Sequence, residues 1–327
     1  MASTISLTTT LPASSSPHKF SRTSSIRCSS SKYPPESFEL TTNGHATRKQ
    51  NHLGHTPKLP PPRPRRIILI RHGQSEGNVD EAVYTRVADP KIPLTDKGRA
   101  QAKECGKKMR EMIERDGADD WKVYFYVSPY RRTRETLQNL AQAFERSRIA
   151  GMREEPRLRE QDFGNFQDRE KMRVEKVFRQ LYGRFFYRFP NGESAADVYD
   201  RITAKGFRET LRADIDIGRF QPPGERSQNM NVVIVSHGLT LRVFLMRWYK
   251  WTVQQFEGLH NFNNAGMIVM EKGYGGRYSL LMHHTEEELR KFGLTDEMLA
   301  DQEWQKTAMP GELNYDCPMM NSFFTHF

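Results

Sequence analysis

Apolar residues occur in this chain in short runs that alternate with amphipathic segments. The first run, RRIILIRHG at residues 65–73, is rich in isoleucine and ends at Gly73, which predicts a buried strand. The runs KVYFYVSP at residues 122–129 and NVVIVSHG at residues 231–238 predict two more strands of the same kind. GMIVMEK and RYSLLMHH, at residues 266–272 and 277–284, predict closing strands joined in a hairpin.

Helical periodicity fills the segments between these runs. Residues 95–117 predict an amphipathic helix, with Thr95 as its N-cap, Gly98 allowing close packing and Gly117 as its stop. Residues 131–147 and 239–249 predict two further helices. Because strands and helices alternate, the expected fold is an α/β three-layer sandwich, with a central, mostly parallel sheet and helices on both faces.

The two ends of the chain differ in composition from the middle. Residues 1–35 contain no Asp or Glu and are rich in Ser, Thr and basic residues, which is typical of a plastid transit peptide, although an ordinary disordered tail is the alternative. Residues 36–64 are interpreted as a disordered, Pro-rich linker. The expected domain spans residues 65–284. Residues 285–327 form a helical or extended tail that could cover the pocket, mediate a homodimer or pack on the core.

Composition narrows the classes of partner. Hydrophobic residues make up 36% of the chain, the formal net charge is +10 and the mean hydropathy is −0.76. No apolar run approaches the ~20 residues that span a bilayer, so no membrane association is expected. The positive charge is dispersed rather than gathered in one stripe, which argues against nucleic acid and leaves a small anionic substrate as the expected partner. Three scattered cysteines predict neither a disulfide framework nor a metal site. The expected location is the chloroplast, or otherwise the cytoplasm.

Two of the predicted parallel strands end in the same way. Arg71 is followed by His72 and Gly73, and Ser236 is followed by His237 and Gly238. Ligands of such sheets bind outside the carboxyl ends of the strands, so the two histidines are expected to share one site. A single histidine at a strand end is more often a hydrogen-bonded structural residue, and it is the pair that indicates chemistry.

Six motifs occur in a fixed order: RHGQSEGN with PLTDKGRAQA, SPYRRTRET, LREQDFG, FPNGES and VSHGLTLR. This set resembles the histidine phosphatase superfamily over residues 65–272, and within it the phosphoglycerate-mutase-like proteins of plants and fungi. The resemblance implies that His72 is the nucleophile and that Glu160 is the general acid. It also implies that Arg71, Arg132 and His237 hold the phosphoryl oxygens.

The chemistry of these residue types fits the implied roles. A neutral imidazole attacks phosphorus if a backbone carbonyl keeps the proton on its proximal nitrogen, and Gly73 leaves room for that approach. Burial or the phosphate charge must raise the pKa of Glu160 for it to donate a proton near neutral pH. Arginines grip phosphate through planar donors, and Arg131 or Arg134 is the alternative to Arg132. The resemblance further implies substrate or phosphate contacts at Ser75, Asn78 and Gly238, whereas Arg242 is expected to brace a helix and the role of Thr240 stays open.

The segment after Glu160 helps to distinguish a phosphatase from a mutase. It carries seven cations: Arg169, Lys171, Arg173, Lys176, Arg179, Arg184 and Arg188. These either clamp an acidic substrate or form a solvated helix face. The segment lacks the adjacent arginine pair of the mutases, has Phe163 where they place a tyrosine, and its NGES resembles the phosphatases. The favoured function is therefore a metal-independent phosphomonoester phosphatase that acts through a phosphohistidine on a small phosphorylated substrate and needs no cofactor. The alternatives are a mutase that requires a 2,3-bisphosphoglycerate primer, and a non-catalytic protein that binds a phospho-ligand or another protein.

Overall fold

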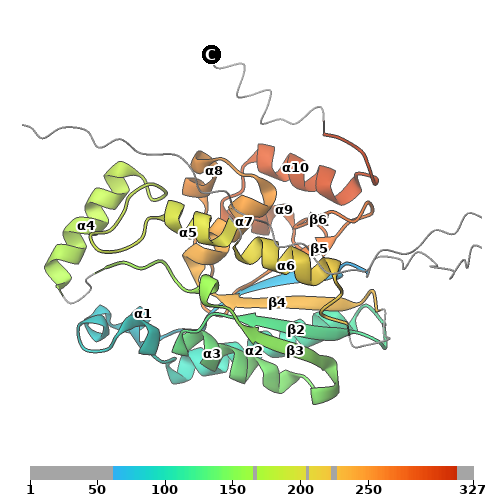
Figure 1. Ribbon diagram of the computed structural model, residues 1–327, viewed down its shortest axis with the longest axis horizontal. Coiled ribbons are helices and arrows are strands. Elements are labelled where there is room, and N and C mark those ends of the chain that lie inside the picture. The colour runs from blue at the N-terminus through green and yellow to red at the C-terminus, as the bar shows by residue number, and fades with distance from the viewer. Residues whose placement is uncertain (1–61, 165–167, 204–205, 222–226, 315–327) are drawn as a thin grey trace, which may run out of the picture. The chain divides into compact units, whose positions relative to one another are not determined.

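The computed structural model describes residues 62–164, 168–203, 206–221 and 227–314. The predicted transit peptide and nearly all of the predicted linker lie outside the described residues. Six strands form one sheet in the order β3-β2-β4-β1-β5-β6 (Figure 1). They are, in chain order, β1 (Arg66–Arg71), β2 (Lys122–Val127), β3 (Ile149–Glu154), β4 (Met230–Ser236), β5 (Met267–Lys272) and β6 (Tyr278–Ser279).

The sheet is mostly parallel, as the sequence predicts. β1 and β2 both run parallel to β4, and β3 runs parallel to β2. β5 is antiparallel to β1 and to β6, which makes the predicted closing hairpin. The buried strands are rich in Ile and Val because β-branched side chains suit a pleated surface that is covered on both sides.

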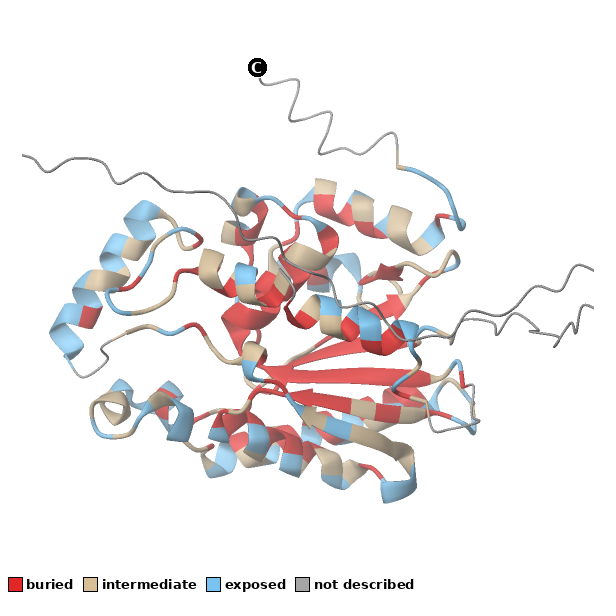
Figure 2. Ribbon diagram, viewed as in Figure 1, coloured by how far each residue is buried: buried red, intermediate tan, exposed pale blue. Residues whose placement is uncertain are grey.

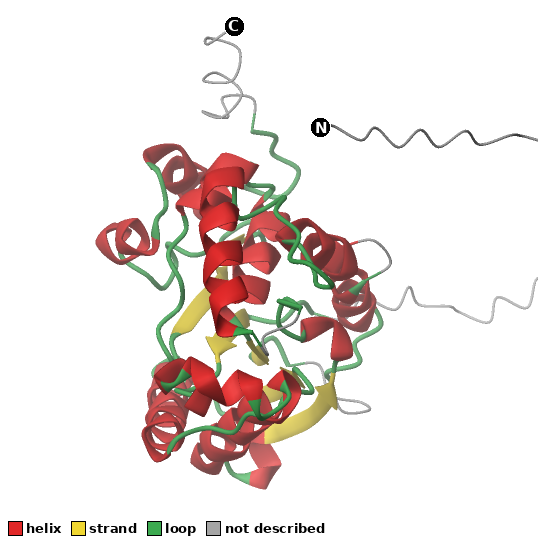
Figure 3. Ribbon diagram, turned by 90° about the vertical axis from the view of Figure 1, so that its left-hand side faces the viewer, coloured by secondary structure: helices red, strands yellow, loops and turns green. Residues whose placement is uncertain are grey.

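Helices cover both faces of this sheet (Figures 1 and 3). The helices are α1 (Glu76–Val79), α2 (Asp96–Glu114), α3 (Arg131–Leu140), α4 (Arg169–Tyr182), α5 (Ala195–Thr203), α6 (Phe207–Asp216), α7 (Gly238–Tyr249), α8 (Val253–Gly258), α9 (Glu286–Phe292) and α10 (Asp296–Thr307). In Figure 1, α2 and α3 lie below the sheet, whereas α5, α6 and α7 lie above it. The three-layer sandwich is therefore confirmed.

Alternate side chains of each central strand pack into two separate hydrophobic cores. In β1, Ile67 and Leu69 join the core beneath α5, α6 and α7, whereas Ile68 and Ile70 join the core beneath α2 and α3. This alternation follows from the two-residue period of a strand. β1 and β4 are accordingly buried along almost their full length (Figure 2), and they form a rigid base for the residues that follow their carboxyl ends.

Several boundaries differ from the sequence-based expectations. The helix expected over residues 131–147 ends at Leu140 and continues only as a short 3-10 turn, Ala141–Ala143. The last strand is limited to Tyr278–Ser279, shorter than expected. β3 was not predicted at all, because this half-exposed strand lacks a continuous apolar run.

The C-terminal segment packs on the core. It forms α9 and α10, separated at Gly293, whose φ of +104° is accessible to glycine but costly for other residues. Leu289, Leu294 and Met298 are buried in the same core as the helices above the sheet. In the part of the chain that the structure describes, no helix is long and apolar enough to cross a bilayer.

Candidate active site

His72 follows β1 directly and is almost completely buried. Its Nδ1 lies 2.7 Å from the carbonyl oxygen of Gly73, the arrangement expected from the sequence. If Nδ1–H donates to this carbonyl, Nε2 is left with a free lone pair. Burial, reinforced by Arg132 and Arg71, places the pKa of His72 well below its usual value. The ring is therefore neutral near pH 7, as a nucleophile must be.

Two glycines allow the chain to approach itself beside His72. A Cβ on Gly73 would lie 2.4 Å from the carbonyl oxygen of Gly98, and a Cβ on Gly98 would lie 2.1 Å from that of Gln74. Both contacts are with backbone, which cannot move aside easily. The close packing expected of Gly98 is therefore present, and it fixes the loop that carries His72 against α2.

His237 follows β4 and faces His72, with the two ring centroids 5.3 Å apart. Arg71 and Ser236 are register partners on the neighbouring strands β1 and β4, so the two histidines that follow them meet. His237 Nε2 lies 2.8 Å from Ser128 Oγ, whereas its buried Nδ1 has no hydrogen-bond partner among the described residues. Burial also lowers the pKa of His237. If the Ser128 hydroxyl donates to Nε2, Nδ1 carries the proton and can donate it to an anion.

The two expected arginines differ in their surroundings. Arg132, at the start of α3, is buried, and its guanidinium donates to the carboxylate of Asp89 at 2.7 Å. Arg71 is partly buried; its Nη1 donates to the carbonyl of Phe262, and its buried Nε has no acceptor among the described residues. Arg131 and Arg134, the alternatives to Arg132, pair with Glu135 and Glu154 on the surface. The geometry thus favours Arg132 as the member of the site.

Glu160 supplies the carboxyl group of the site. Burial is the largest influence on its pKa and raises it, against the opposing charge of Arg132 and a hydrogen bond from the backbone of Gln161. This is the direction that the sequence analysis requires of a general acid. Thr240 Oγ1 donates to the carbonyl of Arg159 at 2.8 Å and lies 3.4 Å from Glu160 Oε1. Thr240 therefore holds the loop that carries Glu160.

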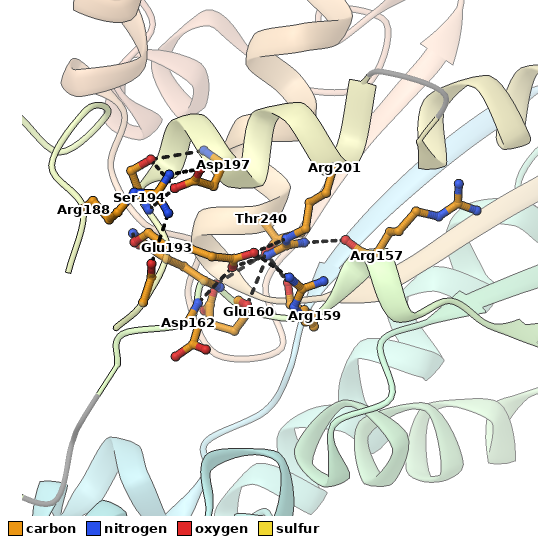
Figure 4. A network of polar contacts seen from close by, with 12 residues as sticks. Arg157, Arg159, Glu160, Asp162, Arg188, Glu193, Ser194, Asp197, Arg201 and Thr240 are labelled. Carbon is orange, nitrogen blue, oxygen red and sulfur yellow. Dashed lines mark hydrogen bonds and ion pairs between the residues drawn. The ribbon is translucent and has the colours of Figure 1, made fainter. Parts of the chain in front are cut away.

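A clamp that the sequence did not reveal fixes this loop (Figure 4). Arg201, on α5, donates to the backbone carbonyls of Arg157, Arg159 and Glu160. Its guanidinium also pairs with Glu193, which in turn accepts from the backbone N–H of Asp162 at 3.0 Å. Glu193 belongs to the NGES motif, so that motif has a structural function here. Ser128 is likewise a site residue that was missed, although its position at the end of β2 was a usable signal.

The three expected substrate contacts lie near the site but differ in exposure. Ser75 is fully buried, and its backbone N–H donates to the side chain of Asn78. Asn78 is exposed and also accepts from Asn264, so it ties two loops together. Gly238 is the first residue of α7, next to His237. Arg242 donates to the carbonyls of Gly238 and Leu259, which is the bracing role expected of it.

Most cations of the segment after Glu160 are engaged by carboxylates. Lys171, Arg173, Lys176, Arg184 and Arg188 pair with Asp168, Glu170, Glu81, Glu257 and Asp197, respectively. Arg179 differs from them. It lies over the rings of Phe163 and Phe189, and its Nε is buried without an acceptor among the described residues. Burial lowers the pKa of Arg179, whereas the charge of Glu160 raises it, so Arg179 lies within electrostatic reach of the candidate acid.

Comparisons with known proteins agree with this geometry. Residues 67–285 match the model of the histidine phosphatase superfamily (branch 1). The chain is 55% identical over 265 residues to "Phosphoglycerate mutase-like protein AT74" of Arabidopsis thaliana, covering 80% of this chain and 83% of that protein. It is 31% identical to "Broad-range acid phosphatase DET1" of Saccharomyces cerevisiae, over 64% of this chain and 86% of that protein.

A solved structure, the native mycobacterial glucosyl-3-phosphoglycerate phosphatase, covers 65% of this chain and 92% of its own, with a TM-score of 0.48 and 23% identity. At that level the likeness concerns the fold alone. The family match spans most of the described residues and includes both histidine motifs. The chain therefore belongs to the histidine phosphatase superfamily, and it is an enzyme of the hydrolase class.

Proposed function

We propose that this protein is a phosphomonoester phosphatase that acts through a phosphohistidine at His72. The neutral, buried imidazole, with its Nδ1 on the Gly73 carbonyl, is the observation that carries the proposal. In the first step Nε2 attacks phosphorus and the bond to the ester oxygen breaks, while Glu160 gives its proton to the leaving oxygen. In the second step Glu160 takes a proton from water, which attacks phosphorus and breaks the P–N bond. Inorganic phosphate leaves, and both side chains return to their starting states.

The positive charge that phosphoryl transfer needs is proposed to come from protein side chains, without a metal. Arg71 directly precedes His72, and the charges of Arg132 and Arg71 both act on His72, so in this proposal both arginines hold a phosphoryl group bound there. His237 adds a donor through Nδ1, which has no other acceptor in the described part of the chain. In this proposal Asp89 gives up or shares Arg132 when phosphate arrives, since the guanidinium has donors on more than one edge.

Hydrolysis rather than mutase chemistry is favoured by the surroundings of Glu160. A mutase must retain a bisphosphorylated intermediate, which calls for several cations free to hold a second acid group. Here five cations of the segment are paired with carboxylates, and Phe163 offers no hydroxyl. We propose that Arg179, which lies against Phe163 and Phe189 and whose buried Nε has no acceptor among the described residues, contacts an acidic group of the substrate. The yeast relative named as a broad-range acid phosphatase adds support.

A comparison of two assays tests the proposal. Phosphate release from a panel of esters, including 3-phosphoglycerate, is measured in excess chelator with the natural chain and with His72→Ala. Interconversion of 2- and 3-phosphoglycerate is measured with and without a 2,3-bisphosphoglycerate primer. The proposal expects chelator-resistant release that disappears in the variant. Primer-dependent interconversion without release would make the chain a mutase, and phosphate esters that raise the melting temperature without turnover would make it a binding protein.

The location is proposed to be the plastid. The basis is the composition of residues 1–35, which contain no Asp or Glu. A fluorescent protein fused after Tyr33 is expected to enter plastids. Fluorescence that remains in the cytosol would overturn this part of the proposal.

A further inference from the structure

A second cationic site lies far from the histidines. A cavity of about 320 Å³ opens between α6, the end of α7, the turn before β6 and α10. Five cations and one carboxylate line it: Arg63, Arg208, Arg212, Lys250, Arg277 and Asp216. The rings of Trp248 and Tyr278 form part of its wall. Figure 1 shows α6 and α10 on the same side of the sheet, and β6 is the last strand of the sheet.

The cations of this cavity are only partly neutralised. Arg212 lies 3.7 Å from Asp216, and Arg208 pairs with Glu209. Arg63 has no carboxylate partner in the described part of the chain, and Lys250 forms no ion pair there, although its charge acts on the carboxyl group of Asp301. Nε of Arg208 is buried, and it has no acceptor among the described residues. Like charges gathered around one concave surface repel each other, and an anion bound between them would remove that repulsion.

Helix α7 separates the cavity from the active site. His237 is the N-cap of α7 and Lys250 is its C-cap. Twelve residues at 1.5 Å each make this helix roughly 18 Å long, so one small ligand cannot occupy both sites. The C-termini of α6 and α7 each add about half a negative charge at the cavity. The carboxylate of Asp216 adds one further negative charge, and the five side-chain cations still exceed the sum.

We propose that this cavity binds a small, soluble organic phosphate that carries at least two negative charges. Arginine guanidinium groups match phosphate oxygens in geometry and charge, and three of the five cations are arginines of α6 and of the turn before β6. The volume suits a ligand of sugar-phosphate size. The Trp248 and Tyr278 rings, which pack edge to face at 5.7 Å, give the carbon skeleton an apolar surface. This binding is independent of catalysis at His72.

The emission of Trp248 provides a local test. The full chain is titrated with methylenediphosphonate, a bisphosphonate that hydrolysis cannot cleave, and the signal is taken as the difference from Trp248→Phe. The cavity variant is Arg212→Gln with Lys250→Asn; asparagine is chosen because Lys250 has a φ of +59°. The control variant is Lys97→Gln with Lys103→Gln, which removes the same charge from the exposed face of α2. Melting temperatures verify that all variants are folded.

A saturable change in emission is expected in the natural chain and, with the same midpoint, in His72→Ala. The cavity variant should shift the midpoint roughly 10- to 100-fold, and the control variant should leave it within about twofold. No saturable change, a change that the cavity variant keeps, or an equal loss in the control variant would overturn the proposal. If His72→Ala abolishes the signal, the ligand occupies the active site instead, which also overturns it.

Discussion

The floor of the active site, which consists of the strand ends before the two histidines, and helix α4 differ in how deeply their side chains are buried. The floor consists of strand ends: His72 and His237 are buried and follow strands whose side chains are almost fully enclosed. α4 instead contributes one buried residue, Met172, and exposes an apolar stripe that includes Leu181, which is 80% exposed. Figure 2 shows the contrast between red strands and a largely blue α4.

From this difference we infer that the reaction depends on the strand ends and that α4 influences which substrate is bound. The floor can hold His72, His237 and Arg132 in one geometry because moving any of them would disturb the packed sheet. α4 is attached through surface ion pairs such as Lys176 with Glu81, which contribute little stability each. We expect changes to the floor to abolish the reaction, and changes to α4 to alter only which esters react.

Replacement of the nucleophile should have the largest effect. His72→Ala removes the lone pair that we propose attacks phosphorus, so the rate of phosphate release should fall by roughly 10⁴-fold or more. Steady-state release with a chromogenic ester measures it. A variant that keeps more than about a tenth of the natural rate would contradict the assignment of His72.

The second-largest effect is expected from removal of the proposed proton donor, Glu160. Glu160→Gln keeps the shape of the side chain but cannot donate or accept the proton, so kcat should fall by roughly 10²- to 10⁴-fold. The reduction should be smaller for esters whose leaving group needs no protonation, such as p-nitrophenyl phosphate. Asp162→Asn is the matched control, because it removes an exposed carboxylate two residues further along the chain. Equal losses in both variants would point to charge rather than to proton transfer.

Truncation of a leucine should lower the free energy of unfolding strongly in the packed region and hardly at all on α4. Leu158 is fully buried and precedes the loop of Glu160, so Leu158→Ala should lower the free energy of unfolding by about 2–5 kcal/mol. Leu181→Ala makes the same chemical change on the exposed stripe of α4 and should alter it by less than about 0.5 kcal/mol. Urea titration measures both. A large loss from Leu181→Ala would show that α4 is covered in solution.

The role of Arg179 should appear in KM rather than in kcat. Arg179→Ala should raise KM about tenfold for esters with a second acid group, such as 3-phosphoglycerate, because the expected partner of that group is lost. For p-nitrophenyl phosphate KM should change little. Arg173→Ala is the control on the same helix, since Arg173 is exposed and pairs with Glu170. The proposal for Arg179 fails if both variants affect the two substrates alike.

The smallest of the expected effects is the change of kcat on the acid side of the pH profile. The pKa of His72 is lowered, so its imidazole stays neutral below pH 6.5, and the pKa of Glu160 is raised, so its acid form persists to higher pH. Between about pH 7 and pH 5.5, kcat should therefore stay within about threefold or rise. It should decline on the alkaline side, and that decline should disappear in Glu160→Gln. A steep loss of kcat near pH 6.5 would mean that a histidine with an ordinary pKa controls the rate.

The sequence could predict the floor because its signals are local. Isoleucine and valine runs define β1 and β4, and each ends in a His-Gly pair, so parallel pairing alone brings His72 and His237 together. β3 escaped prediction because it is a half-exposed edge strand that contains Gly151 and Arg153. Its place in the sheet comes from pairing with β2 rather than from an apolar run.

Other site features depend on tertiary contacts that no local pattern encodes. Arg201 lies on α5, but it donates to the backbone of residues 157, 159 and 160, far away in the sequence. Asp89 meets Arg132 from a 3-10 turn that no periodicity marks. The seven cations after Glu160 could be counted from the sequence, but only the structure shows that Arg179 lies against the rings of Phe163 and Phe189.

A rapid-quench labelling experiment tests the central claim most directly. The full chain is mixed with an ester labelled in its phosphoryl group, quenched in base within milliseconds, and the labelled residue is mapped after digestion. The account predicts acid-labile label on His72, none in His72→Ala, and accumulation of label when Glu160→Gln slows the attack of water. Turnover by the natural chain with no label on His72, or with label on another residue, would contradict the phosphohistidine mechanism.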